Sequence, residues 1–405
     1  MEELELLKLL SLGEDSRRQF KKNIHNIDSL AAEMVAFSNS SGGQIFIGIS
    51  DDGSIDEGLS REDINRLNEM LSNAASQKVI PPINPENQVI TINDKLVMVV
   101  NIQEGINKPY QDSSSHFWVK SGADKRKLTA REELQRIFQS SNLIHADEIL
   151  AKGLSTADLD MEYFQQFFQK RYGESLYEAE SGVAKCGETH FRYSTDALNK
   201  LLSNLNLAKD GQLNLAAALL FTKNPSNYLP AFIVKAAAFP SLELTTETYL
   251  DSRDITGKLS DIFQQTLSFI LINIHHIQGD QGINSIGIPE IPRIVLEELI
   301  ANALIHRDYF ISAPVRVFIF LDRVEIISPG HLPNNLTVEN IKAGNSNIRN
   351  PVLASFANHI LPYRGFGSGI LRALQNHPHI DFEDDRAANL FKAIIYRPSY
   401  ESVSC

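Results

Sequence analysis

The stretch AFSNSSGGQIFIGISDDG (36–53) carries the signals that decide the fold of the first part of the chain. A helix ends within it: Asp28 suits an N-cap before LAAEMVAFS, and NSSGG (39–43) is typical of a helix stop. QIFIGI (44–49) has the β-branched and aromatic residues of a strand, and DDG (51–53) suits a tight turn. A helix followed at once by such a strand predicts an α/β domain.

Strand signals continue beyond this stretch. VITIN (89–93) and LVMVVNI (96–102) predict a hairpin joined by Asp94-Lys95, and HFWVKSG (116–122) predicts a further strand. We expect an α/β (α+β) fold overall. Its three expected parts are an α/β domain over residues 1–140, a helical connector over residues 141–200, and a C-terminal α/β sandwich over residues 201–405.

Composition places the chain among ordinary globular proteins. Apolar residues make up 43% of its 405 residues and charged residues 22%, which excludes a disordered or fibrous chain. The net charge of −12 excludes a general polycation but allows a local basic patch. Cys186 and Cys405 form no disulfide framework, and the acidic start MEELELLKLL is unlike a signal peptide. With apolar runs too short to span a bilayer, we expect a cytoplasmic protein without a membrane partner.

A second informative stretch lies in the last third of the chain. IPRIVLEELIANALIHR (291–307) predicts a helix on which Glu298, Asn302 and His306 recur every four residues and so share a face. A carboxylate and a carboxamide so placed can activate a water and hold a hard cation such as Mg²⁺. RGFGSGI (364–370) alternates glycines before another predicted helix, where backbone N–H groups can approach phosphate oxygens. The alternative is an amphipathic helix whose polar residues face water.

Four segments follow one another here: EELIANALIHRDY (297–309), SPGHLP (328–333), RNP (349–351) and GFGSGI (365–370). In this order they resemble the divergent GHKL-type (Bergerat) ATPase module of bacterial proteins labelled RecG-like or divergent AAA. The resemblance implies that Glu298 activates the attacking water, that Asn302 binds Mg²⁺, and that ATP is the nucleotide. The adenine-reading Asp-x-Gly-x-Gly box of that family is replaced by Ser328-Pro329-Gly330. The other residues implied at the nucleotide are His306, Arg307, Asp308, Gly330, Arg349, Asn350, Gly365, Gly367 and Gly369.

The N-terminal part shows a resemblance of its own. EDSRRQFK (14–21), the stretch 36–53, and HFWVKSGADKRKL (116–128) form three ordered blocks similar to the Schlafen-type AlbA-like domain. Basic residues cluster in the first and third blocks, and if they converge they would form a phosphate-tracking patch, with Phe117 and Trp118 available for base stacking. The expected nucleic-acid contacts are Arg17, Lys21, Lys120, Lys125 and Arg126. The alternative is a solvated charged surface with Trp118 in the core.

Some Schlafen-type domains cleave RNA with three acidic residues. Glu14 matches the first of them, and Asp51 or Asp52 the third. Gln19 stands at the second, where a neutral carboxamide weakens a site that needs paired carboxylates to hold a divalent metal.

The sequence therefore predicts a cytosolic, ATP- and Mg²⁺-binding regulatory protein that binds nucleic acid, with a role in transcription and a weak Mg²⁺-dependent ATPase activity. DNA and RNA remain equally open, and the AlbA resemblance implies a homo-oligomer. Two alternatives stand beside this reading. One is a non-enzymatic scaffold with a vestigial nucleotide site, and the other is a metal-dependent RNase built on Glu14 and Asp51.

Overall fold

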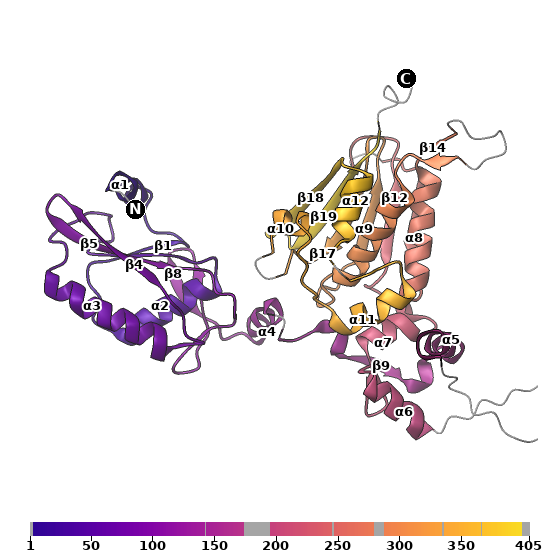
Figure 1. The fold of residues 1–405 in the computed structure, drawn as a ribbon, viewed down its shortest axis with the longest axis horizontal. Helices are drawn as coiled ribbons and strands as arrows, with labels where there is room; N and C mark the ends of the chain where they lie inside the picture. Colours follow the sequence, from indigo (N-terminus) through magenta and orange to yellow (C-terminus); the bar gives the residue numbers. More distant parts are fainter. Residues whose placement is uncertain are drawn as a thin grey trace, which may run out of the picture. The chain divides into compact units, whose positions relative to one another are not determined.

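The structure is a computed structural model. It describes residues 3–141, 143–173, 195–244, 247–278, 287–333, 336–365 and 367–398. The chain divides into two compact units, Met1–Ile144 and His145–Cys405 (Figure 1). Within the described ranges, no helix has the length and apolar character needed to cross a membrane.

The first unit is built on a four-stranded sheet. The strand order is β1-β2-β5-β4, with β1 and β2 parallel and the other two pairs antiparallel. The strands are β1 (Arg18–Lys21), β2 (Gly43–Ile47), β4 (Glu86–Ile92) and β5 (Lys95–Ile102). The predicted hairpin is thus present as β4 and β5. Its turn is Asn93-Asp94 rather than Asp94-Lys95, since both residues have the positive φ angles of a type I′ turn, 47° and 62°.

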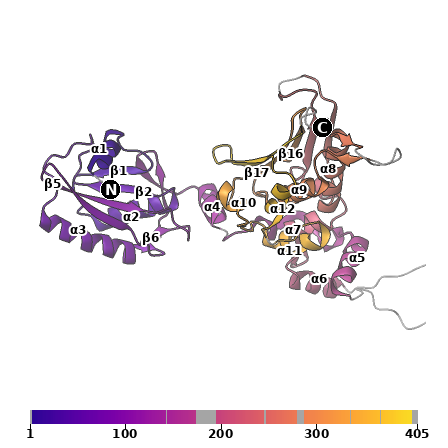
Figure 2. The ribbon, with the colours of Figure 1, turned by 45° about the horizontal axis from the view of Figure 1, so that its top comes forward.

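Helices cover both faces of this sheet. α2 (Ile27–Asn39) and α3 (Arg61–Asn73) pack against Ile45 and Ile47 of β2, whereas α1 (Glu3–Ser11) packs against Phe46 on the opposite face. Figures 1 and 2 show α1 and α3 on the two sides of the strands. Successive side chains of β2 point to opposite faces of the sheet and therefore contribute to two separate hydrophobic cores. The remaining elements are β3 (Val79–Ile80), β6 (Gln111–Asp112), the hairpin β7 (Trp118–Ser121) and β8 (Asp124–Lys127), and α4 (Arg131–Ser140).

The start of α2 differs from the prediction. Asn26, not Asp28, is the N-cap, and its side-chain oxygen accepts hydrogen bonds from the backbone N–H groups of Asp28 and Ser29 at 2.9 and 3.0 Å. Asn and Asp are equally good N-caps, so the choice between two candidates two residues apart is not settled by residue type.

The second unit is built on a six-stranded mixed sheet. The strand order is β13-β12-β16-β17-β19-β18, and only β12 and β16 run parallel. The strands are β12 (Val234–Ala238), β13 (Asp251–Ile255), β16 (Val315–Ile319), β17 (Arg323–Pro329), β18 (Ile380–Asp385) and β19 (Leu390–Tyr396). Helices α8 (Leu259–Asn273), α9 (Arg293–His306) and α12 (Gly369–Asn376) pack together on one face of this sheet (Figure 1).

The described part of the predicted connector, residues 141–200, is not a separate helical element. Residues 150–155 form a strand, β9 (Leu150–Ser155), which pairs with β11 (Gln212–Asn214). Ala151, Leu154, Phe164 and Phe167 join the same hydrophobic core as the six-stranded sheet. Other elements of this unit are α5 (Met161–Tyr172), α6 (Thr195–Asn204), β10 (Ala208–Lys209), α7 (Leu215–Phe221), β14 (His276–Ile277), β15 (Ile288–Pro289), α10 (Val338–Lys342) and α11 (Pro351–Ile360).

Candidate functional site

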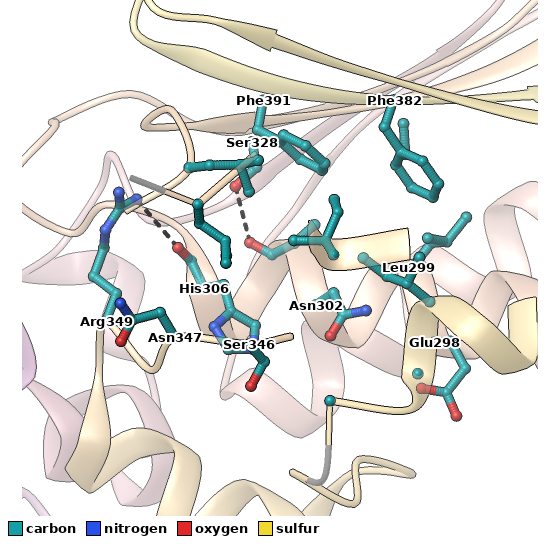
Figure 3. A pocket seen from close by; sticks show the side chains of 18 of the residues that line it. Glu298, Leu299, Asn302, His306, Ser328, Ser346, Asn347, Arg349, Phe382 and Phe391 are labelled. Carbon is teal, nitrogen blue, oxygen red and sulfur yellow. Dashed lines mark hydrogen bonds between the residues drawn. The ribbon is translucent and has the colours of Figure 1, made fainter. Parts of the chain in front are cut away.

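A pocket opens between α9, α12 and the six-stranded sheet of the second unit. It holds about 990 Å³ of space, counting its open mouth. The four-residue spacing on α9 brings Glu298, Asn302 and His306 to it in succession, as predicted (Figure 3). The polar face of α9 therefore lines the pocket.

Glu298 is the buried acid of the pocket. Only 4% of the residue is exposed, and its Oε1 forms an ion pair with Nη2 of Arg372 on α12 at 2.5 Å. Burial raises the pKa of the Glu298 carboxyl, and the nearby Arg372 and Arg364 partly offset that rise. The side chain is thus a carboxylate held at the edge of a largely apolar cavity.

Asn302 and His306 differ in how much of their bonding capacity is used. Among the residues that the structure describes, the Asn302 carboxamide has no hydrogen-bond partner, so its oxygen and its N–H₂ group are free to meet a ligand. The His306 ring is 3.0 Å from the Tyr363 hydroxyl, and burial lowers the pKa of His306 to about 4. His306 is therefore neutral at physiological pH.

The glycine loop leads directly into α12. Gly365 and Gly367 have positive φ angles of 71° and 70°, and Gly369 begins the helix. The N-cap of α12, Ser368, makes no side-chain capping bond. Ser368, Gly369 and Ile370 line the pocket, so the start of α12 borders it without a side-chain cap from Ser368, an arrangement that suits an anion.

The wall opposite α9 is apolar. Ile326, Phe382 and Phe391 project from the sheet, and the two phenylalanine rings stack with their centroids 5.9 Å apart (Figure 3). The Ser328 hydroxyl donates to the Ala303 carbonyl at 3.1 Å, so it retains only acceptor capacity toward the cavity. This wall suits the flat face of an aromatic ligand.

Arg349 and Gly330 close one end of the pocket. The Arg349 guanidinium donates to the carbonyl oxygens of His306 and His331 at 3.3 and 2.6 Å. Gly330 has a φ of 96°, and a Cβ there would lie 2.5 Å from Nη1 of Arg349. Arg349 therefore joins the end of α9 to the turn after β17.

Three of the predicted nucleotide residues do not line the pocket. The Arg307 guanidinium is buried between the rings of Phe232 and Tyr309, and Asn350 donates from Nδ2 to the Ile305 and Arg307 carbonyl oxygens. Asp308 accepts from the backbone N–H of Phe310 at 2.9 Å. These side chains hold the turn after α9, and their contact with a nucleotide stays a prediction.

The structure adds pocket residues that the sequence analysis missed: Tyr363, Arg372, Phe382, Phe391, Ser346 and Asn347. Arg372 follows Gly369 by three residues and so lies on the same side of α12, a helical spacing that was available in the sequence. The two phenylalanines come from β18 and β19, consecutive strands that pair antiparallel at the edge of the sheet.

In the first unit, most cations of the predicted basic patch form ion pairs with acids of the same unit. The Lys120 side chain is 1% exposed, and its Nζ donates to Glu33 at 2.9 Å and to Gln19 at 2.8 Å. Lys125 pairs with the other oxygen of Glu33. Lys120 therefore cannot track phosphates at the surface, because it neutralises a buried acid.

The remaining candidates divide. Arg126 forms a two-bond ion pair with Glu133. Within the described ranges, the side chains of Arg17 and Lys21 have no ion-pair or hydrogen-bond partner. Trp118 packs against the core that α2 and α3 form with the sheet, and its Nε1 donates to Asp112 at 2.8 Å. Its ring is therefore not free to stack on a nucleic-acid base.

The alternative of a metal-dependent RNase depends on whether Glu14 and Asp51 can hold a metal ion. Glu14 Oε1 accepts from Gln19 Nε2 and from the Phe20 backbone N–H, both at 2.6 Å, while Asp51 is exposed. The part of the chain that the structure describes contains no group of three His, Cys, Asp or Glu side chains suited to a metal ion. The donor set does not fit the metal that such an RNase needs.

Two family models match the chain. The model described as "Schlafen, AlbA_2" matches residues 14–129, and the model described as "Putative ATP-dependent DNA helicase recG C-terminal" matches residues 312–386. The predicted resemblance is confirmed for these two parts of the chain, which are similar to the Schlafen/AlbA_2 family and to the C-terminal region of RecG-like proteins. The second match includes Gly330, Arg349 and the glycine loop but begins after α9, so it leaves Glu298 and Asn302 unmatched.

No curated protein matches the chain. Among solved structures, the DIP2311 protein from Corynebacterium diphtheriae is 18% identical, with a TM-score of 0.44, covering 98% of this chain and 69% of that one. The N-terminal domain of a RecG-related protein from Nitrosomonas europaea is 19% identical, with a TM-score of 0.24, covering 32% of this chain and 96% of that one.

Proposed function

We propose that the second unit binds ATP with Mg²⁺ in the pocket between α9 and α12 and hydrolyses it slowly. The observation that carries this proposal is the meeting, in one cavity, of a buried carboxylate, an unpartnered carboxamide, an uncapped helix N-terminus and an apolar wall. Together these provide for water activation, cation binding, phosphate binding and base binding.

Each residue has a distinct task in this proposal. The wall of Ile326, Phe382 and Phe391 takes the base, and the first turn of α12 takes the phosphates. The donor set fits Mg²⁺, because this cation usually keeps several waters and is held by one or two protein oxygens together with substrate phosphates. Asn302 supplies a protein oxygen, and Glu298 accepts the proton of the attacking water. When bound, Mg²⁺ would neutralise phosphate charge.

The test is calorimetric titration of Mg²⁺-ATP into the full chain, together with a phosphate-release assay. We expect Asn302→Ala to weaken Mg²⁺-dependent binding and Glu298→Gln to abolish turnover without any loss of binding. Glu297→Gln is the matched control, because Glu297 directly precedes Glu298 on α9 and pairs with Arg293 at 2.7 Å instead of lining the pocket.

The outcomes separate enzyme from scaffold. Equal turnover by the wild-type chain and Glu298→Gln would refute the role of Glu298. No ATP binding by the wild-type chain would favour the scaffold with a vestigial site, an alternative supported by the presence of Ser328 where the family has an adenine-reading Asp.

For the first unit we propose nucleic-acid binding, with the whole chain acting as a nucleotide-dependent regulator of transcription. Likeness to the Schlafen/AlbA_2 family supports this proposal, as do Arg17 and Lys21, whose side chains have no partner among the residues that the structure describes. Arg17→Ala with Lys21→Ala should lower affinity for single-stranded DNA or RNA and flatten its salt dependence by about two units of log–log slope at most. Arg126→Ala is the control, since its charge is already paired. An unchanged salt slope in the double variant would exclude this face.

A further inference from the structure

The carboxylate assigned to water activation is not free in this structure. Glu298 Oε1 lies 2.5 Å from Arg372 Nη2, and a Cβ added to Gly369 would lie 2.5 Å from Glu298 Oε2. Helix α12 thus pairs with one oxygen of the side chain through Arg372 and leaves no room for a side chain at Gly369 beside the other. The ion pair with Arg372 lowers the proton affinity of this buried carboxylate relative to the same side chain without its partner, although burial still keeps the pKa of Glu298 above its ordinary value.

Arg372 is placed to serve two partners. It lies in the first turn of α12, where its backbone N–H donates to the Ser368 carbonyl at 3.0 Å, directly behind the uncapped N-terminus. Its Nε is buried and has no hydrogen-bond partner in the described part of the chain. A guanidinium offers five N–H donors, so this one has capacity left beyond its contact with Glu298.

Phosphate is the ligand class that fits this spare capacity. Arginine binds carboxylate and phosphate with the same forked geometry, and both hydrogen bonds are strengthened by charge. A polyphosphate at the N-terminus of α12 would lie within the same pocket wall as Arg372. The two anions would then compete for one cation.

We propose that Arg372 is a phosphate-responsive positioning residue: it restrains Glu298 in the empty pocket and transfers to the phosphates of a bound nucleoside triphosphate, which releases Glu298 for water activation. This inference rests on the proposed nucleotide site. It explains how Glu298 is kept inactive until a nucleoside triphosphate binds there. Breaking the Arg372–Glu298 pair opposes triphosphate binding, whereas a nucleoside without phosphates leaves the pair intact.

The test is a double-mutant cycle measured by calorimetry on the full chain with Mg²⁺. The ligands are adenosine and a non-hydrolysable ATP analogue, and the variants are Glu298→Gln, Arg372→Met and the two combined. We expect Glu298→Gln to bind the analogue about five- to tenfold more tightly, because the competitor for Arg372 is weakened. Arg372→Met should bind it about tenfold more weakly, and adenosine binding should stay within about twofold in both.

The combined variant separates competition from simple charge removal. If Arg372 is shared, Glu298→Gln gives no gain in the Arg372→Met background; an equal gain in both backgrounds would mean that Glu298 only repels phosphates, which would overturn the proposal. Arg372→Lys should recover part of the lost affinity, and Arg364→Met, which removes a neighbouring exposed cation, should not reproduce the full loss of Arg372→Met.

Two failures remain distinguishable. If the wild-type chain binds neither ligand, the proposed nucleotide site is wrong. If it binds the analogue but Glu298→Gln leaves that affinity unchanged, the nucleotide site stands and the switch is wrong. Because Glu298→Gln is tested alone as well as combined, the outcome does not depend on Arg372→Met folding correctly.

Discussion

At the scale of single residues, Lys120 shows how a charge can be misread from sequence. A lysine among other cations suggests a surface patch, yet this one neutralises buried Glu33 from α2. The two residues are 87 positions apart, so only the tertiary structure brings them together. Removal of Glu33 would leave the buried Lys120 ammonium without its ion-pair partner, which is costly.

Asp147 is a second residue whose role depends on its surroundings. It is fully buried, its Oδ2 accepts from the Leu353 backbone N–H at 2.8 Å in the first turn of α11, and its Oδ1 has no partner among the described residues. Burial raises the pKa of Asp147 to about 6. The folded chain therefore holds the Asp147 proton more tightly than the unfolded chain does.

We predict that Asp147→Asn removes a pH-dependent penalty. The pKa of Asp147 is higher in the folded chain than the roughly 3.9 expected in the unfolded chain. The stability that the protonated Asp147 contributes to the wild-type chain is therefore fully present below about pH 4 and is lost as the pH rises toward 6. The difference between the two chains in unfolding free energy should shift in favour of Asn by up to about 3 kcal/mol from pH 4 to pH 7.5.

Urea titrations at these two pH values measure that shift. Glu148→Gln serves as the control, because Glu148 is an exposed neighbour. A difference between wild type and Asp147→Asn that is the same at both pH values would show that Asp147 ionises normally in the folded chain.

At the scale of elements, the glycine loop before α12 is constrained by contact as well as by backbone angle. A Cβ on Gly367 would overlap the Gly344 carbonyl oxygen, whereas a Cβ on Gly365 would have its nearest neighbour at an ordinary 3.6 Å. Both residues have similar positive φ angles, so the two sites differ mainly in available space.

We predict that Gly367→Ala disturbs the pocket more than Gly365→Ala does. Both changes add backbone strain of about 1 kcal/mol, but only Gly367→Ala also forces the loop away from Gly344. Gly367→Ala should therefore lower both the melting temperature and the affinity for Mg²⁺-ATP more strongly. Equal effects of the two variants would indicate that backbone angle alone matters here.

At the scale of the whole molecule, the boundary between the units lies close to a structural anchor of the second one. Ile149 accepts from the backbone N–H of Leu215, and Asp147 caps α11, so both contacts lie within the first five residues of that unit. The segment 145–149 is thus part of the second unit rather than a linker.

We predict that a fragment of residues 145–405 folds, whereas a fragment of residues 151–405 is less stable. The shorter fragment loses the Asp147 cap, and removal of a cap costs about 1 kcal/mol. Thermal unfolding followed by circular dichroism compares the two directly. Equal melting temperatures would mean that residues 145–150 do not support the unit.

The sequence by itself determined the elements whose signals are local. Residue type and spacing predicted the helix–strand passage at 36–53, the hairpin β4–β5, and the shared face of Glu298, Asn302 and His306, because each depends on neighbours a few positions away. Only the tertiary structure decided which strands became neighbours, that β9 joined the second unit, that Arg372 reached Glu298, and that Lys120 was buried. The reason is physical: burial and pairing between distant segments depend on which faces pack together, and residue type alone does not specify the partner.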